Sequence, residues 1–369
     1  MSRWAWAEID LGAIRHNLEV LRGVAAPAAV WAVVKAEGYG HGSVPVAKAA
    51  MDAGAAGLCV ALVQEGLALR DAGLDCPILV LSEQPPSELV AAVSAGLELT
   101  VYSYWQLDAI AVAGGQRHPV HLKIDTGMRR VGAAVDDALG LAEAIAESPA
   151  VRLAGVCTHF AMADEPADPF TTMQLEAFDD VLKALVLAGH RPPVVHAANS
   201  AATLAVPAAR FDMVRTGIAI YGISPSRALD LRTAALRPAL SLRARVAHVK
   251  EVRAGDRISY GLRHRFPADT IVATLPLGYA DGVPRRLFAG GGEVLIGGRR
   301  RPIVGVVTMD QLMVDCGTDA VAVGDEAVLI GTQEGESISV NEWGDRVGTI
   351  GYEVVCGISQ RVDRRYTSA

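Results

Sequence analysis

Eight apolar, strand-like segments recur between residues 30 and 222, and longer amphipathic segments with a helical period separate them. Regular alternation of strand and helix implies parallel pairing through right-handed crossovers. Eight such units in about 200 residues favour a closed (β/α)8 barrel of the TIM type over an open sheet. The segments are VWAVVKA (30–36), GLCVAL (57–62), CPILVLS (76–82), ELTVYS (98–103), VHLKIDTG (120–127), VRLAGVCTHF (151–160), PVVHAANS (193–200) and MVRTGIAIYG (213–222).

The pattern changes after about residue 235, where short alternating segments are separated by Gly- and Asp-containing turns and no long helical period follows. We therefore predict two domains: an α/β barrel over residues 1–235 and a mostly β C-terminal domain over residues 236–369. A further strand is expected within residues 1–10, and its assignment is open between the barrel and the β domain.

Composition narrows the class of protein and its location. The chain is 51% hydrophobic and 20% charged, which is typical of a folded globular protein. Its net charge of −7 argues against a nucleic-acid partner. No apolar stretch reaches the roughly 18 residues of a membrane span, and charged residues interrupt the start of the chain where a signal peptide needs an apolar core. Five cysteines without a C-x-x-C pair indicate reduced thiols, so we expect a cytoplasmic protein.

Lys35 ends the first barrel strand, and function in such barrels gathers at the carboxyl ends of the strands. Burial there would lower the pKa of the amine and suit it to Schiff-base chemistry. Tyr39 follows among Gly38, Gly40 and Gly42, which let the backbone approach a ligand. The alternative is a surface lysine beside a flexible loop.

The strand VHLKIDTG places Lys123 and Asp125 on one face, and Arg130 follows it. Buried charges are costly unless they are paired, so a structural Lys–Asp pair is one interpretation. The other is a substrate site in which Arg130 binds a carboxylate with two hydrogen bonds.

Three polar residues end later strands: His159, His196 and Ser200. A single histidine at such a place is more often structural than catalytic. Gly217 and Ile218 follow the last strand, where barrels commonly bind phosphate through backbone N–H groups. No nucleotide-binding or zinc motif occurs, and the histidines form no metal pair. A lysine and a phosphate-type loop together suggest a phosphorylated aldehyde cofactor, with no metal.

These segments carry a resemblance that spans nearly the whole chain. The stretches AEIDLGAIRHNL, VVKAEGYGHG, LKIDTGMRRVG, THFAMADE, HAANSAA, VRTGIAIYG, ISYGLRHRF, LPLGYADGVPR, VGVVTMDQ and IGYEVVCGISQRVDR occur in family order and spacing. The chain resembles the alanine racemase family of fold-type III pyridoxal-phosphate enzymes. The resemblance implies a two-base interconversion of L- and D-alanine, with D-alanine supplied for peptidoglycan.

The resemblance also implies the residue roles. Lys35 would hold pyridoxal phosphate covalently and act as the base on the D side, while Tyr260 would be the base on the L side. Tyr260 would come from the second subunit of a homodimer, so that each active site is shared across the interface. The other roles it implies are phosphate binding by Tyr39, Ser200, Gly217, Ile218 and Tyr352; contact with the pyridine ring by His159 and with its nitrogen by Arg215; binding of the amino-acid carboxylate by Arg130 and the N–H of Met309; and carbamylation of Lys123, which orients Arg130.

The chain departs from the common family pattern at three positions. Glu37 stands where Asn or Asp is usual, and Gly351 stands where Asn is more frequent. Val306 replaces an arginine that lines the substrate access in many members. None of these departures falls on Lys35 or Tyr260, but the charge and selectivity of the substrate entryway are left open.

Other functions on this architecture are weighed against that interpretation. A broad-specificity or serine racemase is the close alternative. A pyridoxal-phosphate decarboxylase of basic amino acids would need an acidic pocket, and its cysteine-bearing motif is not found. A pyridoxal-phosphate carrier consists of a barrel alone, and the β domain with Tyr260 argues against it.

Overall fold

The computed structural model describes residues 3–368 and contains two compact units. The barrel unit comprises Ile14–Gly38 and Ser43–Arg237. The β unit comprises three segments: the N-terminal residues up to Ala13, the short segment Tyr39–Gly42, and the residues from Pro238 onward.

Eight parallel strands form the barrel sheet in the order β8-β7-β6-β5-β4-β3-β2-β9. The end strands of this order are joined by hydrogen bonds from Asp212 N–H to the Val195 carbonyl (3.1 Å) and from Arg215 N–H to the Ala198 carbonyl (2.9 Å). The predicted eight-stranded barrel is therefore confirmed. The strands are β2 (Ala29–Val33), β3 (Gly57–Val60), β4 (Ile78–Val80), β5 (Glu98–Val101), β6 (His118–Lys123), β7 (Val151–Cys157), β8 (Val195–His196) and β9 (Met213–Thr216).

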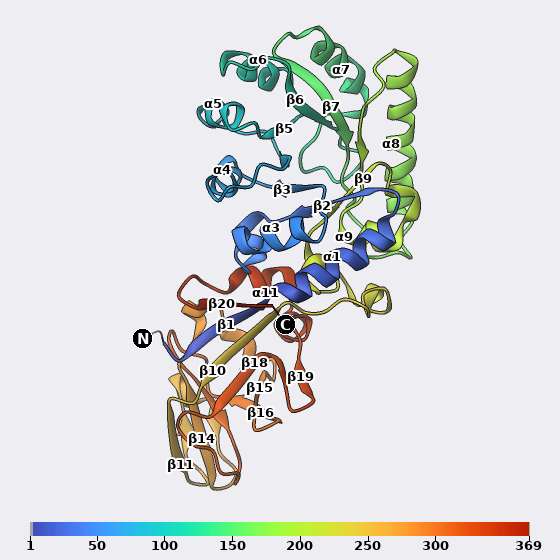
Figure 1. Cartoon of the computed structure of the whole chain (residues 1–369). Coiled ribbons are helices and arrows are strands. Elements are labelled where there is room, and N and C mark those ends of the chain that lie inside the picture. The colour runs from blue at the N-terminus through green and yellow to red at the C-terminus, as the bar shows by residue number, and fades with distance from the viewer. Residues whose placement is uncertain (1–2, 369) are drawn as a thin grey trace. The chain divides into compact units, whose positions relative to one another are not determined.

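Helices lie outside these strands, and Figure 1 shows α4 to α8 following one another around them. Every residue of β3 and β4 is buried, because helices cover one side and the barrel interior the other. Strands covered on both sides are mainly apolar, which explains the runs in the sequence. The helices are α1 (Leu11–Ala25), α3 (Ser43–Asp52), α4 (Val63–Asp71), α5 (Pro86–Ser94), α6 (Tyr104–Val112), α7 (Ala138–Glu147), α8 (Phe170–Leu187) and α9 (Ser200–Ala205).

The β unit is built on one large sheet, ordered β11-β14-β17-β16-β15-β18-β10-β1-β20, with β19 paired to β18. Its pairs are antiparallel except that β1 pairs β20 in parallel. A separate hairpin joins β12 (Arg257–Ile258) to β13 (His264–Arg265). The large sheet contains β1 (Ala5–Asp10), β10 (Leu240–Arg245), β11 (His248–Val252), β14 (Thr270–Leu275), β15 (Glu293–Ile296), β16 (Arg299–Val304), β17 (Leu312–Asp315), β18 (Glu326–Gln333), β19 (Glu336–Ile338) and β20 (Asp363–Thr367).

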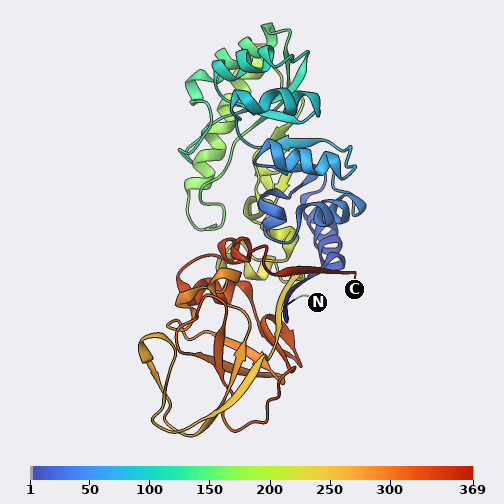
Figure 2. The ribbon, with the colours of Figure 1, turned by 90° about the vertical axis from the view of Figure 1, so that its left-hand side faces the viewer.

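Two short helices of this unit were not expected, because no long helical period follows residue 235. They are α10 (Val340–Val347) and α11 (Gly351–Gly357), seen among the orange and red segments in Figure 2. Each is only about two turns long, too short for a clear period. The Ser339 side chain accepts a hydrogen bond from Glu342 N–H (3.0 Å), so the S-x-x-E pattern marks the start of α10.

The length and hydropathy of the helices bear on whether the chain could cross a membrane. Among residues 3–368, no helix is both long enough and apolar enough to span a membrane.

Candidate active site

The backbone turns abruptly after β2, at the lysine that the sequence singles out. The segment α2 (Lys35–Tyr39) is a left-handed turn, with φ of 52°, 54° and 58° at Ala36, Glu37 and Gly38. Left-handed geometry costs a residue with a Cβ roughly 1–2 kcal/mol. Ala36 N–H donates to Glu65 Oε1 (2.6 Å), which holds the turn in place. Lys35 is thereby fixed at the carboxyl end of β2, with its side chain partly buried.

Arg215 of β9 is the centre of the polar groups inside the barrel unit, where it is buried. Its Nη2 donates to the carbonyls of Thr158 (2.8 Å) and Ala197 (3.0 Å) and lies 3.4 Å from His159 Nδ1. Its Nη1 lies 2.6 Å from His196 Nδ1. Within residues 3–368, Arg215 Nε and the second Nη1 hydrogen have no acceptor.

Several cations share the carboxyl end of the barrel. Burial, together with the charges of Arg215, Arg130 and Lys35 and against an opposing effect of Cys157, lowers the pKa of Lys123 to about 8. Burial and the same positive charges hold the pKa of His159 well below its ordinary value. His159 is therefore neutral at pH 7. A site with this excess of positive charge suits a ligand that carries anionic groups.

Ser200 gathers backbone N–H groups from the turn after β9. Its Oγ accepts hydrogen bonds from Gly217 N–H (2.8 Å) and Ala219 N–H (3.3 Å). Ile218 lies between these two donors and is buried. The structure thus brings Ser200, Gly217 and Ile218 together, as a site built from backbone N–H groups requires.

The loop after β6 carries Arg130 on an exposed segment. Asp125 Oδ1 accepts hydrogen bonds from Gly127 N–H (2.9 Å) and Arg129 N–H (3.0 Å) and so shapes the loop. Lys123 Nζ donates to the Leu81 carbonyl (3.3 Å). Across the described residues no ion pair joins Lys123 to Asp125, so the interpretation of a structural Lys–Asp pair is not supported.

The remaining predicted residues lie in the β unit. Tyr39 and Tyr352 pack together there, with ring centroids 6.1 Å apart. Tyr352 is in α11, directly after Gly351. Met309 is exposed, and its N–H donates to no acceptor within residues 3–368. Its carbonyl accepts from Ala280 N–H (3.1 Å). The structure therefore pairs the two tyrosines and leaves a free N–H at Met309.

Tyr260 lies on a constrained loop of the β unit. The residue is 71% exposed. The preceding residue, Ser259, has φ 64° and ψ −177°, a conformation that is strained for a residue with a Cβ. The Ser259 hydroxyl donates to the Val306 carbonyl (2.7 Å), and a Cβ at Gly305 would lie 2.6 Å from the Ser259 Cβ. Val306 is 4% exposed, so at this position the chain has a buried apolar side chain.

Sequence reasoning missed some polar residues of the barrel interior. Glu98 and His121 are joined to His196 and Arg215 by hydrogen bonds. A signal was present for His121, because it alternates with Lys123 and therefore shares its face of β6. For Glu98, which opens β5, the sequence held no comparable signal.

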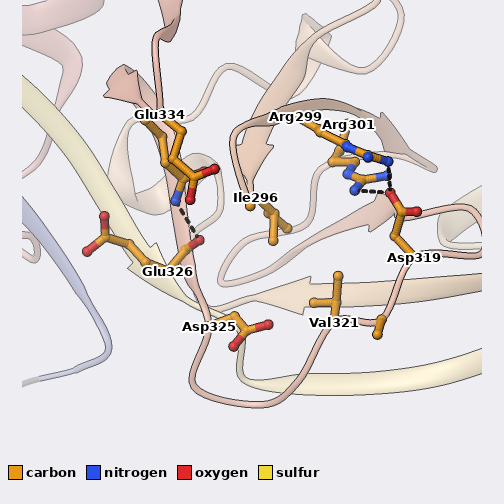
Figure 3. A pocket seen from close by; sticks show the side chains of 11 residues that line it. Ile296, Arg299, Arg301, Asp319, Val321, Asp325, Glu326 and Glu334 are labelled. Carbon is orange, nitrogen blue, oxygen red and sulfur yellow. Dashed lines mark hydrogen bonds and ion pairs between the residues drawn. The ribbon is translucent and has the colours of Figure 1, made fainter.

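A pocket of about 500 Å³ in the β unit is a different feature (Figure 3). Arg299 and Arg301 both bind Asp319 there. Glu326 pairs with Arg243 (2.6 Å) on β10. These ion pairs hold segments of the sheet together, and we do not assign chemistry to this pocket.

Two kinds of chemistry gain no support from the side chains. Within residues 3–368, no group of three or more His, Cys, Asp or Glu residues is placed to hold a metal ion. Burial raises the pKa of the Cys59 thiol to about 12 and raises that of Cys157. Thiols with such pKa values are poor nucleophiles at neutral pH.

The fold and the site are those of a barrel enzyme with a second, β-rich unit, and comparison with known proteins gives the family. The alanine racemase N-terminal domain model matches residues 9–225, and the C-terminal domain model matches residues 239–366. The chain therefore belongs to the alanine racemase family.

Individual relatives agree over the full length. The chain is 47% identical to an alanine racemase of Symbiobacterium thermophilum, covering 99% of this chain and 97% of that protein. It is 46% identical to one from Thermobifida fusca, covering all of both. The crystal structure of an alanine racemase from Streptomyces lavendulae has a TM-score of 0.94 at 42% identity, covering 100% of this chain and 98% of that one.

Proposed function

We propose that this protein interconverts L- and D-alanine with pyridoxal phosphate as its cofactor. The observation that carries the proposal is the set of groups at the carboxyl end of the barrel: Lys35 on its fixed turn, neutral His159 and the donors of Arg215. Relatives named alanine racemase over the full length of the chain support the same activity.

The residues present fit this cofactor. A phosphate needs convergent donors, and the turn after β9 brings backbone N–H groups, two of which donate to Ser200 Oγ in this structure, to the same point as the Ser200 hydroxyl. The ring nitrogen needs a donor, and Arg215 has two that lack acceptors among the described residues. We assign the phosphate to Ser200, Gly217, Ile218, Tyr39 and Tyr352, and the ring to His159 and Arg215.

Racemisation requires proton transfer on both faces of the amino-acid Cα. Bound pyridoxal phosphate withdraws electrons from the substrate and so makes the Cα proton acidic. Lys35 takes or returns the proton on the D side, and Tyr260 does so on the L side. When one base removes the proton from its face of the Cα, the other base returns a proton to the opposite face. One turnover therefore inverts the centre.

Arg215 controls how far the negative charge spreads. A guanidinium keeps its protons in proteins, so Arg215 can donate a hydrogen bond but does not protonate the ring nitrogen. By leaving the ring nitrogen unprotonated, Arg215 would weaken the cofactor as an electron sink and so favour proton return over transamination. Neutral His159 beside Arg215 adds no further positive charge.

The substrate carboxylate binds to Arg130 and to the free N–H of Met309. Lys123 supports Arg130, since a lysine with a pKa near 8 has enough neutral amine to add carbon dioxide as a carbamate. The carbamate then carries a negative charge that orients the Arg130 guanidinium.

The proposal also covers the subunit assembly, the domain division and the cellular location of the protein. Tyr260 is exposed on its own chain, and we place it in the barrel site of a partner subunit in a two-fold homodimer. The division into domains at residues 235 and 236 belongs to the proposal as well. We further propose a cytoplasmic enzyme that supplies D-alanine for peptidoglycan, consistent with five free cysteines.

One assay tests the activity. The purified protein is incubated with L-alanine, L-serine, L-lysine or L-ornithine, and products are resolved by chiral chromatography. D-Alanine formed faster than D-serine supports an alanine racemase, and equal rates indicate a broad-specificity racemase. A diamine product indicates a decarboxylase, and no conversion of any substrate contradicts the proposal.

A further inference from the structure

A line of hydrogen bonds runs through the barrel unit from Glu98 on β5 to Arg215 on β9. Glu98 Oε2 lies 2.8 Å from His121 Nε2, and His121 Nδ1 lies 2.9 Å from His196 Nε2. His196 Nδ1 lies 2.6 Å from Arg215 Nη1. The two imidazoles and the guanidinium are buried, while the Glu98 side chain is 20% exposed. We name these four residues the Glu98 relay; the proposed proton transfers use neither Glu98 nor His121.

Chemistry allows only one placement of the protons in this relay. A guanidinium carries only donor groups, so Arg215 must donate and His196 Nδ1 must accept. His196 then carries its proton on Nε2 and donates it to His121 Nδ1. His121 carries its proton on Nε2 and donates it to Glu98. The two ends, a cation and a carboxylate, together fix the tautomer of both histidines.

The barrel makes space for this arrangement. A Cβ on Gly155 of β7 would lie 2.5 Å from His121 Nδ1 and 2.9 Å from its Cε1. The pairing of β6 with β7 also shifts register between Val120 and His121. Irregularities of this kind re-aim a side chain. Burial holds the pKa of His196 well below its ordinary value, which agrees with a neutral ring.

We propose that Glu98 and His121 are positioning residues that hold the Arg215 guanidinium through His196. With one Nη1 hydrogen committed to His196 and both Nη2 hydrogens committed to carbonyls, Nε and the second Nη1 hydrogen are left for a ligand. This inference rests on the proposed function, because that function assigns the ligand atom to the pyridine nitrogen. The carboxyl group at the far end of the relay thus helps to keep the reaction on racemisation.

The test compares Glu98→Gln with Glu98→Met in the holoenzyme. The two side chains are neutral and similar in size, but only glutamine can accept the proton of His121. In Glu98→Met we expect the His121 and His196 tautomers to become mixed, as seen by NMR of ¹⁵N-histidine-labelled protein. We also expect pyridoxal phosphate to bind about tenfold more weakly and the ratio of transamination to racemisation to rise about tenfold.

In Glu98→Gln all three quantities should stay within about twofold of the unsubstituted protein. A second variant, Gly155→Ala, should reproduce the Glu98→Met pattern by displacing the His121 ring. His118→Gln is the matched control, because His118 is a buried histidine of β6 outside the Glu98 relay. Its ring is hydrogen-bonded to the Leu97 carbonyl (2.7 Å). This variant should change thermal stability without changing the tautomers or the ratio.

Identical behaviour of Glu98→Gln and Glu98→Met in tautomers, cofactor affinity and ratio would overturn the relay. The relay would also be overturned if Glu98→Met changed the melting temperature but left the tautomers, the cofactor affinity and the ratio unchanged. If the unsubstituted protein fails to racemise alanine, the proposed function fails, and the tautomer measurement still decides whether the relay exists.

Discussion

The two proposed bases lie in contrasting surroundings. Lys35 ends a buried strand of the barrel unit, and its turn is fixed by Glu65. Groups around it are connected by hydrogen bonds through Arg215. Tyr260 lies on a strained loop of the β unit and is 71% exposed. The barrel residues are held by one another within their unit, whereas Tyr260 presents its reactive group to the surroundings.

The contrast teaches where each half obtains its reactivity. In the barrel unit, burial and neighbouring charges already set protonation, as the lowered pKa values of Lys123 and His159 show. A phenol has a reference pKa of about 10, so a tyrosine acts as a base near neutral pH only where positive charge stabilises its phenolate. In the proposed dimer, the barrel unit of the second chain would bring its cations to Tyr260.

The largest expected effect is the loss of Lys35. Lys35→Ala removes both the attachment point of the cofactor and one base, so racemisation should fall by at least about a thousandfold. The yellow absorbance of the purified protein should also be lost. Lys48→Ala, at an exposed position of α3, is the control and should change neither. Borohydride reduction that labels Lys123 in the unsubstituted protein would contradict the assignment.

Loss of Tyr260 should separate the two faces of the reaction. Tyr260→Phe should lower kcat/KM for racemisation by about 10² to 10⁴ and leave cofactor absorbance unchanged. In D₂O, the Cα hydrogen of D-alanine should still exchange, because Lys35 serves that face, and that of L-alanine should not. NMR follows both. Tyr104→Phe, an exposed tyrosine of α6, is the control. Equal exchange of both enantiomers would refute the division of labour.

A smaller effect is expected at the substrate carboxylate. Arg130→Met should raise KM for alanine about 10- to 100-fold and change kcat less, because a charge-assisted contact is lost from the bound substrate. Arg129→Met, at the exposed neighbouring position, should leave KM unchanged. Steady-state kinetics measure both. An unaltered KM in Arg130→Met would remove this residue from the substrate site.

The smallest effect concerns Lys123. With a pKa of about 8, about one amine in ten is neutral at pH 7 and half at pH 8, so carbamylation at constant dissolved CO₂ should increase over this range. ¹³CO₂ should give a carbamate signal in ¹³C NMR, and KM for alanine should fall severalfold as it appears. Lys123→Ala should abolish both responses. A KM that ignores CO₂ at pH 8 would argue that the lysine acts as a free amine.

Sequence patterns predicted the barrel well and its irregular parts poorly. Eight buried strands leave apolar runs, so all eight were located, but α10 and α11 are too short to show a period. The left-handed turn at Ala36 and Glu37 has no signal in residue type, because both usually avoid that conformation. Contacts such as Glu98 with His121 depend on strand order and closure, which the local sequence does not contain.

The measurement that tests the central claim most directly is complementation between Lys35→Ala and Tyr260→Phe. Each mutant homodimer lacks a base at both sites, whereas a mixed dimer that shares its sites across the interface regains one complete site. Random mixing makes about half the dimers mixed, so refolding the two mutants together should restore roughly a quarter of the unsubstituted racemase activity. Mixed dimers verified by mass spectrometry but without activity would show that both bases come from one chain.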